Sequence, residues 1–324
     1  MKIVVMVAAA LLFANAEASA KIDKRNLLEI ATKPIVVAVV DTGTDIYHKD
    51  LRDSIWTNAG ESGLDAQGNN KENNKIDDDG NGFVDDLHGW NFVNNTNEVI
   101  DDVGHGTHIA GIIKREFNRY EGGLKSNSTF VPTVRLMILK YYNPKGKNFE
   151  NLVNSTKAIQ YANKMKVHVI NYSGGGGESN YAEHQALLQS LRQKIVFVAA
   201  AGNNFSDTDI KKYYPANYNL ANIISVAATD RNGDLMPFSN YGRRSIDIAA
   251  PGKWILSTLP NHKYGVMSGT SQATAHITGV VAKIIARSPS SKEKVYKSLL
   301  ADAKFNKTLL GKTKTQLAII SDSK

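Results

Sequence analysis

Short apolar runs alternate with longer amphipathic segments along most of the chain. The runs are rich in β-branched residues and have the continuous apolar pattern of strands covered on both faces. They lie at residues 35–40, 134–139, 167–170, 195–200 and 223–228. Between them, Asn151–Met165 and Tyr181–Leu191 carry apolar residues at helical spacing. This alternation predicts an α/β fold in which a mostly parallel sheet lies between two layers of helices.

Two further helices are expected from segments rich in small and apolar residues, Gly106–Ile113 and Ala273–Ala286. The chain shows no internal repeat, low-complexity tract or linker. We therefore expect a single domain over residues 34–324.

The amino terminus has the pattern of an export signal. Lys2 precedes the apolar run Ile3–Ala14, and Ala18-Ser19-Ala20 has the small residues of a signal-peptidase site. The run is shorter than the ~20 apolar residues that a bilayer span needs. We expect residues 1–20 to be a signal peptide, residues 21–33 to be a short N-terminal segment, and the protein to be secreted or periplasmic, without membrane contact after cleavage.

Composition narrows the possible partners and sources of stability. The net charge is +8, but the basic residues are scattered and form no stripe interleaved with aromatics, so we expect no nucleic-acid partner. The 324-residue chain has no cysteine, so disulfides cannot stabilise it. Stability must come from the core and from bound ions. We also expect the protein to be a monomer.

Three short motifs carry the strongest chemical signal. They are Val40-Asp41-Thr42-Gly43, His105-Gly106-Thr107-His108 and Gly269-Thr270-Ser271. A serine hydroxyl is a weak nucleophile, so it needs an imidazole to take its proton and a carboxylate to orient that imidazole. Taken singly, each residue has an ordinary explanation, Asp41 as a turn residue and Thr270-Ser271 as a helix cap. Together they predict a triad of Asp41, His105 and Ser271.

In longer form, residues 39–43, 105–111 and 268–276 resemble the three signatures of the subtilases, the subtilisin-like serine proteases. Similarity continues at His48, Asp50 and Leu51, at Tyr214–Ala216 with its expected cis-proline, and at Ala249–Gly252. The resemblance implies a subtilisin-like fold and a secreted endopeptidase. In it Ser271 attacks the scissile carbonyl, His105 acts as general base and then general acid, and Asp41 orients the imidazole.

The same resemblance implies an oxyanion hole and a substrate-binding strand. Asn203 follows Ala200, Ala201 and Gly202 and would donate its side-chain amide to the oxyanion. Ser173, Gly174 and Gly175 would pair with an extended polypeptide substrate, and Ala200, Ala201 and Gly202 would also contact it. Gly174 stands where relatives usually carry leucine, so we expect a widened first specificity pocket that accepts bulky apolar residues before the cleaved bond.

An acidic run at residues 74–86 is the second chemical signal. Closely spaced carboxylates and amides with intervening glycines suit calcium, and the expected ligands are Asp77, Asp79, Asn81 and Asp85. The run begins like an EF-hand loop but has His88 at its twelfth position, so a solvated acidic loop is the alternative. Gly174–Gly177 and Gly311-Lys312-Thr313 lack complete phosphate-binding patterns. We expect no organic cofactor.

One departure and two alternative functions accompany this interpretation. The interval Lys21–Lys33 is much shorter than the propeptide of most secreted subtilases. A catalytically silent subtilase fold that serves as a binding module is one alternative. A serine esterase is the other, but such enzymes usually have a G-x-S-x-G elbow and the chain order Ser, Asp, His.

Overall fold

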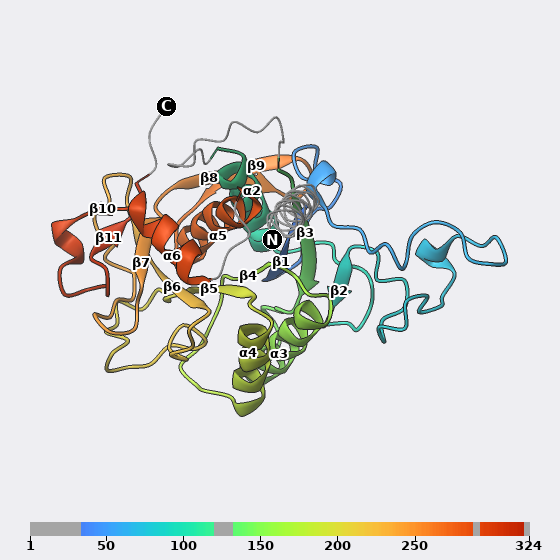
Figure 1. Ribbon diagram of the computed structural model, residues 1–324, viewed down its shortest axis with the longest axis horizontal. Coiled ribbons are helices and arrows are strands. Elements are labelled where there is room, and N and C mark those ends of the chain that lie inside the picture. Colours follow the sequence, from blue (N-terminus) through green and yellow to red (C-terminus); the bar gives the residue numbers. More distant parts are fainter. Residues whose placement is uncertain (1–33, 120–131, 288–291, 321–324) are drawn as a thin grey trace, which may run out of the picture.

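The computed structural model describes residues 34–119, 132–287 and 292–320. The predicted signal peptide and the segment 21–33 lie outside the described residues. Within those residues, nine strands form one sheet in the order β10-β11-β7-β6-β5-β4-β1-β3-β2 (Figure 1). The strands are β1 (Ile35–Asp41), β2 (Gly89–Asn91), β3 (Val134–Lys140), β4 (Val169–Tyr172), β5 (Val196–Ala200), β6 (Ile223–Thr229), β7 (Ile248–Pro251), β10 (Lys304–Phe305) and β11 (Leu317–Ala318).

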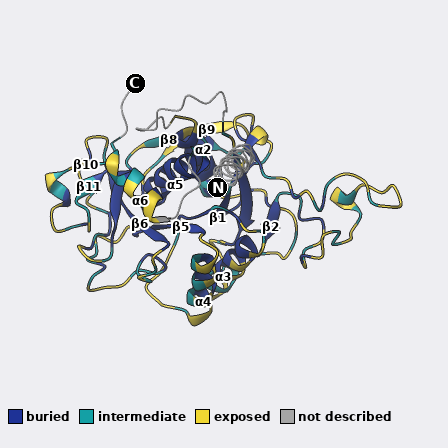
Figure 2. Ribbon diagram, in the orientation of Figure 1, coloured by how far each residue is buried: buried dark blue, intermediate teal, exposed yellow. Residues whose placement is uncertain are grey.

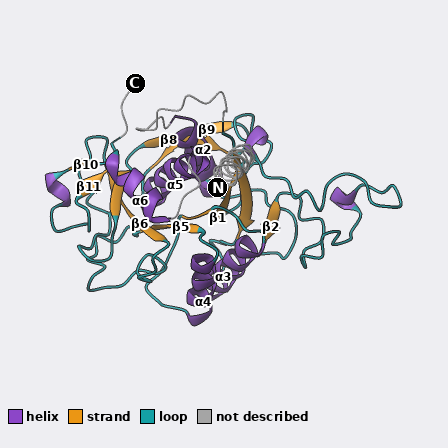
Figure 3. Ribbon diagram, in the orientation of Figure 1, coloured by secondary structure: helices purple, strands orange, loops and turns teal. Residues whose placement is uncertain are grey.

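Helices cover both faces of this sheet, which confirms the predicted three-layer α/β/α architecture (Figure 3). One face carries α2 (His105–Arg119), α5 (Thr270–Arg287) and α6 (Lys292–Ala301), and the other carries α3 (Asn148–Lys164) and α4 (Tyr181–Arg192). All strand pairs in the sheet are parallel except β10 with β11. A separate antiparallel hairpin, β8 (Ile255–Leu259) with β9 (Lys263–Met267), packs beside α2.

The central strands are apolar at every position because helices lie on both sides of them. In β1, Val37 and Val39 pack with residues of α2 and α5, while Ala38 and Val40 pack with residues of α3. All four side chains are fully buried. Removal of this apolar surface from water on both faces is what stabilises the sheet centre, and it explains the absence of polar alternation in the sequence.

Helix α5 is buried along almost its whole length, from Thr270 to Ala286. Figure 2 shows it as a dark ribbon beside α2, above the middle of the sheet. It contacts α2, α6 and the strands from β4 to β7. Because every side of it meets protein, it lacks the polar stripe of a surface helix.

The carboxyl ends of β1 and β4 form the topological switch point of the sheet. β1 lies between β3 and β4, and the chain adds later strands outward from β4 through β5 and β6 to β7. Loops that leave neighbouring strands in opposite directions open a crevice, and ligands of α/β folds bind there. Asp41 ends β1 and Ser173 follows β4 at this place.

The acidic segment lies at the opposite side of the sheet from β10. Residues 57–88 contain little regular structure apart from the short 3₁₀ helix η2 (Lys71–Asn73), and they extend away from the body near β2 (Figure 1). Two further 3₁₀ helices of the same length are η1 (Arg52–Ser54) and η3 (Lys307–Leu309). Within the described ranges, none of the helices combines the length and the apolar character required to cross a bilayer.

Candidate active site

Asp41 and His105 are brought together by the end of β1 and the start of α2. Nδ1 of His105 lies 2.7 Å from Oδ1 of Asp41, a hydrogen-bond distance. The aspartate side chain is 4% exposed and the imidazole 29% exposed. The carboxylate thus holds the ring from its buried side, while part of the ring stays accessible to a substrate.

The electrostatic surroundings change the basicity of His105. Burial by itself lowers the pKa of the imidazole, but the negative charge of Asp41 and the hydrogen bond between them raise it, and the net result is a pKa above the ordinary value of 6.5. The hydrogen bond places the ring proton on Nδ1 when the imidazole is neutral. Nε2 is then the nitrogen that can accept a proton.

Asp101 fixes the amino-terminal turn that carries His105. Its Oδ2 accepts hydrogen bonds from the backbone N–H and the hydroxyl of Thr107, at 2.9 and 2.7 Å. Its Oδ1 accepts from the Thr42 hydroxyl at 2.9 Å. A buried carboxylate at this place satisfies a free N–H group of the helix and favours its positive end. Sequence reasoning did not select Asp101 as a site residue, although its position just before the helix was a usable signal.

Glycine at position 106 allows α2 to approach β1 closely. A Cβ atom at Gly106 would lie 2.0 Å from the Gly43 carbonyl oxygen, a distance that no real side chain tolerates. The Gly106 N–H donates to the Thr42 hydroxyl at 2.8 Å. The close contact therefore sets the short distance between Asp41 and His105.

Ser271 is the second residue of α5 and is almost fully buried. Its hydroxyl donates to the Ser173 carbonyl oxygen at 2.8 Å, and the Ser173 hydroxyl donates to the Ser271 carbonyl at 3.1 Å. Both residues are described, and no hydrogen bond joins Ser271 to His105 in this conformation.

Two donors border one small space beside Ser271. The Asn203 side-chain oxygen accepts from the backbone N–H and the hydroxyl of Thr270, at 2.9 and 3.0 Å. This orientation leaves Nδ2 as the outward amide group. A Cβ at Gly269 would lie 3.4 Å from Nδ2 of Asn203 and 3.7 Å from the Ser271 backbone nitrogen. The Gln272 Oε1 atom, 3.0 Å from the same Cβ position, also borders this space. Both nitrogens thus lie close enough to contribute to one oxyanion site.

The two segments expected to line the substrate leave neighbouring strands. β4 and β5 pair with Tyr172 opposite Ala199, so residues 173–175 and 200–202 begin side by side. The widened pocket expected at Gly174 is not found. A Cβ there would lie 2.2 Å from the Tyr141 hydroxyl oxygen, so this tyrosine fills the room that a side chain at position 174 would have taken.

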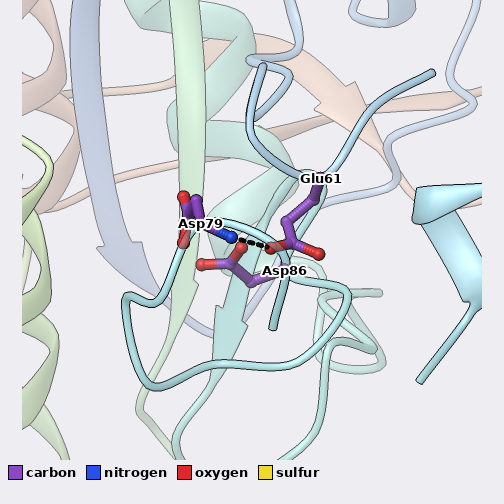
Figure 4. A group of neighbouring side chains, drawn as sticks. All are labelled: Glu61, Asp79 and Asp86. Atoms are coloured by element: carbon purple, nitrogen blue, oxygen red, sulfur yellow. Dashed lines mark hydrogen bonds between the residues drawn. The ribbon is translucent and has the colours of Figure 1, made fainter. Parts of the chain in front are cut away.

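A cluster of three carboxylates forms in the acidic segment (Figure 4). Glu61, Asp79 and Asp86 each place one oxygen so that all lie within 4.8 Å of one another. Glu61 is fully buried, and its Oε1 accepts from the backbone N–H groups of Asp78 and Asp79 at 2.8 and 3.2 Å. Its Oε2 is buried without a hydrogen-bond partner. Burial raises the pKa of both Glu61 and Asp86.

Of the four calcium ligands expected from sequence, Asp79 belongs to this cluster, and Asn81 touches it by donating to Asp86 at 2.8 Å. Asp77 instead accepts from the backbone N–H groups of Asn81 and Gly82. Asp85 accepts from the N–H of Lys75. Asp77 and Asp85 therefore hold the loop, whereas Glu61 and Asp86, which sequence reasoning missed, complete the cluster.

Comparisons with known proteins identify the family of this chain. The model of the subtilase family matches residues 32–319. The major intracellular serine protease of Bacillus subtilis is 35% identical over 259 residues, which are 78% of this chain and 68% of that relative. Subtilisin-like protease 2 of Plasmodium falciparum is 33% identical over 78% of this chain, and the match spans only 17% of that relative's length.

A solved structure shows the same fold. A cold-adapted subtilisin-like serine proteinase superposes with a TM-score of 0.63 at 24% identity, covering 90% of this chain and 89% of the other. The cis peptide bond expected at Pro215 is present. Because the family model covers nearly all described residues and the relatives above share about a third of their aligned positions, the chain belongs to the subtilase family of subtilisin-like serine proteases.

Proposed function

We propose that this protein is a serine endopeptidase that hydrolyses peptide bonds through Asp41, His105 and Ser271. The observation that carries the proposal is the 2.7 Å hydrogen bond from the His105 imidazole to the buried Asp41 carboxylate, with Ser271 at the start of α5 beside two N–H donors. This is the set of parts that acyl transfer needs: a nucleophile, an oriented base and a place for negative charge.

In the proposed reaction, the Ser271 hydroxyl turns from the Ser173 carbonyl toward Nε2 of His105. As its oxygen bonds to the scissile carbonyl carbon, the proton passes to Nε2, and Asp41 stabilises the imidazolium that forms. His105 then gives the proton to the leaving amine, the C–N bond breaks, and an acyl-enzyme remains. A water molecule then attacks the acyl-enzyme carbonyl while His105 takes its proton. His105 returns this proton to the Ser271 oxygen, and the carboxylic acid product is released.

The negative charge on the tetrahedral oxygen would be met by Asn203 Nδ2 and the Ser271 backbone N–H. Thr270 holds the Asn203 amide by its oxygen, so the donor is oriented before the reaction starts. A donor that needs no reorganisation stabilises the transition state more than water does. The amino-terminal end of α5 adds a favourable potential for an anion.

The proposed substrate is a polypeptide in extended conformation, bound along Ser173, Gly174 and Gly175 by backbone hydrogen bonds. A cavity of about 330 Å³ opens beside Gly175–Gly177, between aromatic side chains that include Tyr141, Tyr142 and Phe149. It gives room for a further apolar side chain of the substrate. We also propose that the protein is exported by residues 1–20 and acts as a monomer, without nucleic acid, membrane or organic cofactor.

We further propose that Glu61, Asp79 and Asp86 hold a structural calcium ion. A buried carboxylate oxygen without a hydrogen-bond partner, beside two other carboxylates, carries an uncompensated cost that a cation removes. Oxygen ligands of this kind suit calcium. The ion would offset most of the negative charge of the cluster and fasten the segment 57–88, and it would take no part in the hydrolysis itself.

Casein digestion by the purified protein tests the activity directly. Wild type is expected to digest casein and to be labelled by a fluorophosphonate, and folded Ser271→Ala is expected to do neither. Repeating the digestion with a calcium chelator measures how far activity depends on the ion. A folded wild type that neither digests casein in calcium nor accepts the label supports the alternative, a catalytically silent binding module. Label without peptide hydrolysis but with ester turnover points to an esterase.

A further inference from the structure

A tyrosine ring spans the gap between the two segments that flank the nucleophile. A Cβ at Gly175 would lie 2.4 Å from Cε1 of Tyr213. A Cβ at Gly202 would lie 2.9 Å from Cε2 and from Cζ of the same ring. Cε1 and Cε2 are on opposite edges of the ring, so one edge faces the segment after β4 and the other faces the segment after β5.

This gap is the place that the proposed reaction assigns to the side chain before the cleaved bond. The carbon under attack must lie at the Ser271 hydroxyl, with its oxygen toward Asn203. Ser173 contacts Ser271 on one side of that carbon, and Gly202 directly precedes Asn203 on the other. The next substrate atom is the Cα that carries the side chain, so the side chain points between residues 173–175 and residues 202–203.

The backbone around Tyr213 is firmly held. Its N–H donates to the Asn217 side chain at 3.0 Å, and its carbonyl accepts from the Asn217 N–H at 3.0 Å. The Asn217 amide also donates to the Thr208 carbonyl at 2.9 Å. The next residue, Tyr214, exchanges two backbone hydrogen bonds with Gly176, at 2.7 and 2.8 Å. The ring therefore starts from a fixed Cα position and is half-buried in the gap.

The glycines on both sides make room for the ring and for two polar groups, Asn240 Nδ2 at 2.4 Å from a Cβ at Gly202 and the Tyr214 carbonyl oxygen at 2.5 Å from a Cβ at Gly175. Gly175 has a φ of +150° and Gly202 a φ of +97°, conformations that side-chain-bearing residues rarely adopt. Neither position can therefore take a side chain, and the remaining width is occupied by Tyr213. Burial raises the pKa of its hydroxyl, so the ring stays neutral in the physiological range.

We propose that Tyr213 is a specificity-determining residue that fills the pocket for the residue before the cleaved bond and restricts that residue to glycine, alanine or serine. The inference rests on the proposed endopeptidase function and names its substrate class. It replaces the preference for bulky apolar residues expected from Gly174. A phenylalanine or leucine side chain would need the space that the ring occupies, whereas a hydrogen, methyl or hydroxymethyl group needs little of it.

The test uses matched peptides that differ only in the residue before the scissile bond, alanine or phenylalanine. Wild type is expected to favour alanine by about 100-fold or more in kcat/KM, since pocket differences of a few carbon atoms reach such ratios. Tyr213→Gly should raise kcat/KM for the phenylalanine peptide about 100-fold. It should change kcat/KM for the alanine peptide less than about fivefold. Tyr213→Phe keeps the ring and should keep the wild-type selectivity.

A second control removes an unrelated tyrosine. Tyr181 begins α4 and is 78% exposed, so Tyr181→Ala should leave kcat/KM for both peptides unchanged. Wild type that cleaves the phenylalanine peptide as fast as the alanine peptide would overturn the inference, and so would a folded Tyr213→Gly protein that keeps the wild-type ratio. Fluorophosphonate labelling of the same samples separates the two proposals. Labelled, active protein without the selectivity refutes the specificity role alone, whereas folded protein without label or turnover refutes both.

Discussion

The Asp41 carboxylate uses one oxygen for two donors and leaves the other unpaired. Oδ1 accepts from the Thr42 N–H at 2.8 Å and from His105 at 2.7 Å, while Oδ2 is buried without a hydrogen-bond partner. An unsatisfied buried acceptor costs about 1–3 kcal/mol. That cost is tolerable at a site where the unscreened charge raises the basicity of the neighbouring imidazole.

The raised pKa of His105 sets the pH dependence expected of the enzyme. His105 must be neutral to accept a proton, so kcat/KM falls as the pH drops through its pKa, and the midpoint of this acid limb should lie above 6.5. Asp41→Asn removes the charge that raises the pKa. We expect the midpoint to move to lower pH and kcat to fall about 10⁴-fold. Rates of peptide hydrolysis from pH 5 to 9 check this, and a wild-type midpoint below 6.5 would contradict it.

Asn203→Ala tests the proposed oxyanion donor. We expect kcat to fall about 10²- to 10³-fold with little change in KM, a magnitude known from the equivalent substitution in subtilisin, a relative of this chain. The neighbouring Asn204 is exposed, and its side chain is not part of the proposed site, so Asn204→Ala is the matched control. The kcat values of the two variants, measured by steady-state kinetics, should differ by about 10²- to 10³-fold. A loss expressed only in KM would assign Asn203 to substrate binding instead.

At this scale the sequence was informative about chemistry and silent about pocket shape. Asp41, His105, Asn203 and Ser271 could be selected because each stands in a motif with a chemical reason. Tyr213 could not, because an aromatic residue in a polar loop gains its role only when the loop returns to the gap beside Gly202. The expectation at Gly174 failed for the same reason, since the occupant of the vacated space, Tyr141, comes from another strand end.

Polar groups fix the first two turns of helix α2. Asp101 binds its amino terminus, and His108, one turn later, is fully buried against the β8–β9 hairpin. Nε2 of His108 lies 3.0 Å from the Ile255 carbonyl and 3.2 Å from the Gly265 carbonyl. Burial lowers the pKa of His108 to about 4. The neutral ring is therefore a structural donor that joins the helix to the hairpin.

This depressed pKa makes the stability of the molecule depend on pH. Below pH 6.5 His108 is protonated in the unfolded chain but stays neutral in the folded chain. The free energy of unfolding therefore falls as the pH drops toward 4, by roughly 3 kcal/mol from this residue. His108→Gln keeps a donor but does not titrate, so its stability should change less over the same window. Unfolding curves between pH 4 and 7, recorded in a Ser271→Ala background to prevent self-digestion, measure the difference. Parallel curves for the two proteins would refute the assignment.

Several strands buried on both faces were predicted well from the sequence, although β7, which is also buried, was not. β1, β3, β5 and β6 begin and end within about two residues of the expected runs. The run at 167–170 continues instead as β4 through Asn171 and Tyr172, because the Asn171 side chain finds partners in the interior, the hydroxyls of Ser173 and Thr278. The hairpin β8–β9 was not predicted, since its half-exposed strands lack a continuous apolar run.

Considered as a whole, the molecule joins a compact α/β body to a long acidic excursion. The carboxylate cluster lies where the excursion leaves and re-enters the body, with Glu61 near its start and Asp86 near its end. Asp86 also accepts a hydrogen bond from Tyr161 of α3. A cation at the cluster would therefore tie both ends of the segment to a helix of the body.

Calcium is expected to raise the melting temperature of the Ser271→Ala protein. A ligand that binds only the folded state adds about 3 kcal/mol at a hundredfold excess over its Kd, which corresponds to roughly 5 °C for a domain of this size. Glu61→Gln should abolish most of this shift. Asp77→Asn should retain it, because Asp77 bonds only to the loop backbone. Calorimetry with and without calcium measures both, and an unchanged shift in Glu61→Gln would exclude the cluster as the site.

The sequence located the acidic segment and one member of its cluster, Asp79, but not Glu61 or Asp86. Spacing within the run 74–86 favoured Asp77 and Asp85, because alternate positions of a local loop usually share a ligand. The chain instead folds Glu61, which lies outside the run, against Asp79 and Asp86. This long-range contact depends on the path of the whole segment 57–88, and no periodic pattern in the sequence indicates it.

The buried position of α5 has a consequence for when the protein can cut. Asp41 and His105 come early in the chain, but Ser271 comes late and lies at the start of a helix that is enclosed by α2, α6 and the strands β4 to β7. A nascent or partly collapsed chain therefore has a base and no positioned nucleophile. For the proposed peptidase, an assembled active site therefore requires this late segment of the chain to be in place, and the unfolded chain, itself an extended polypeptide, does not contain that site.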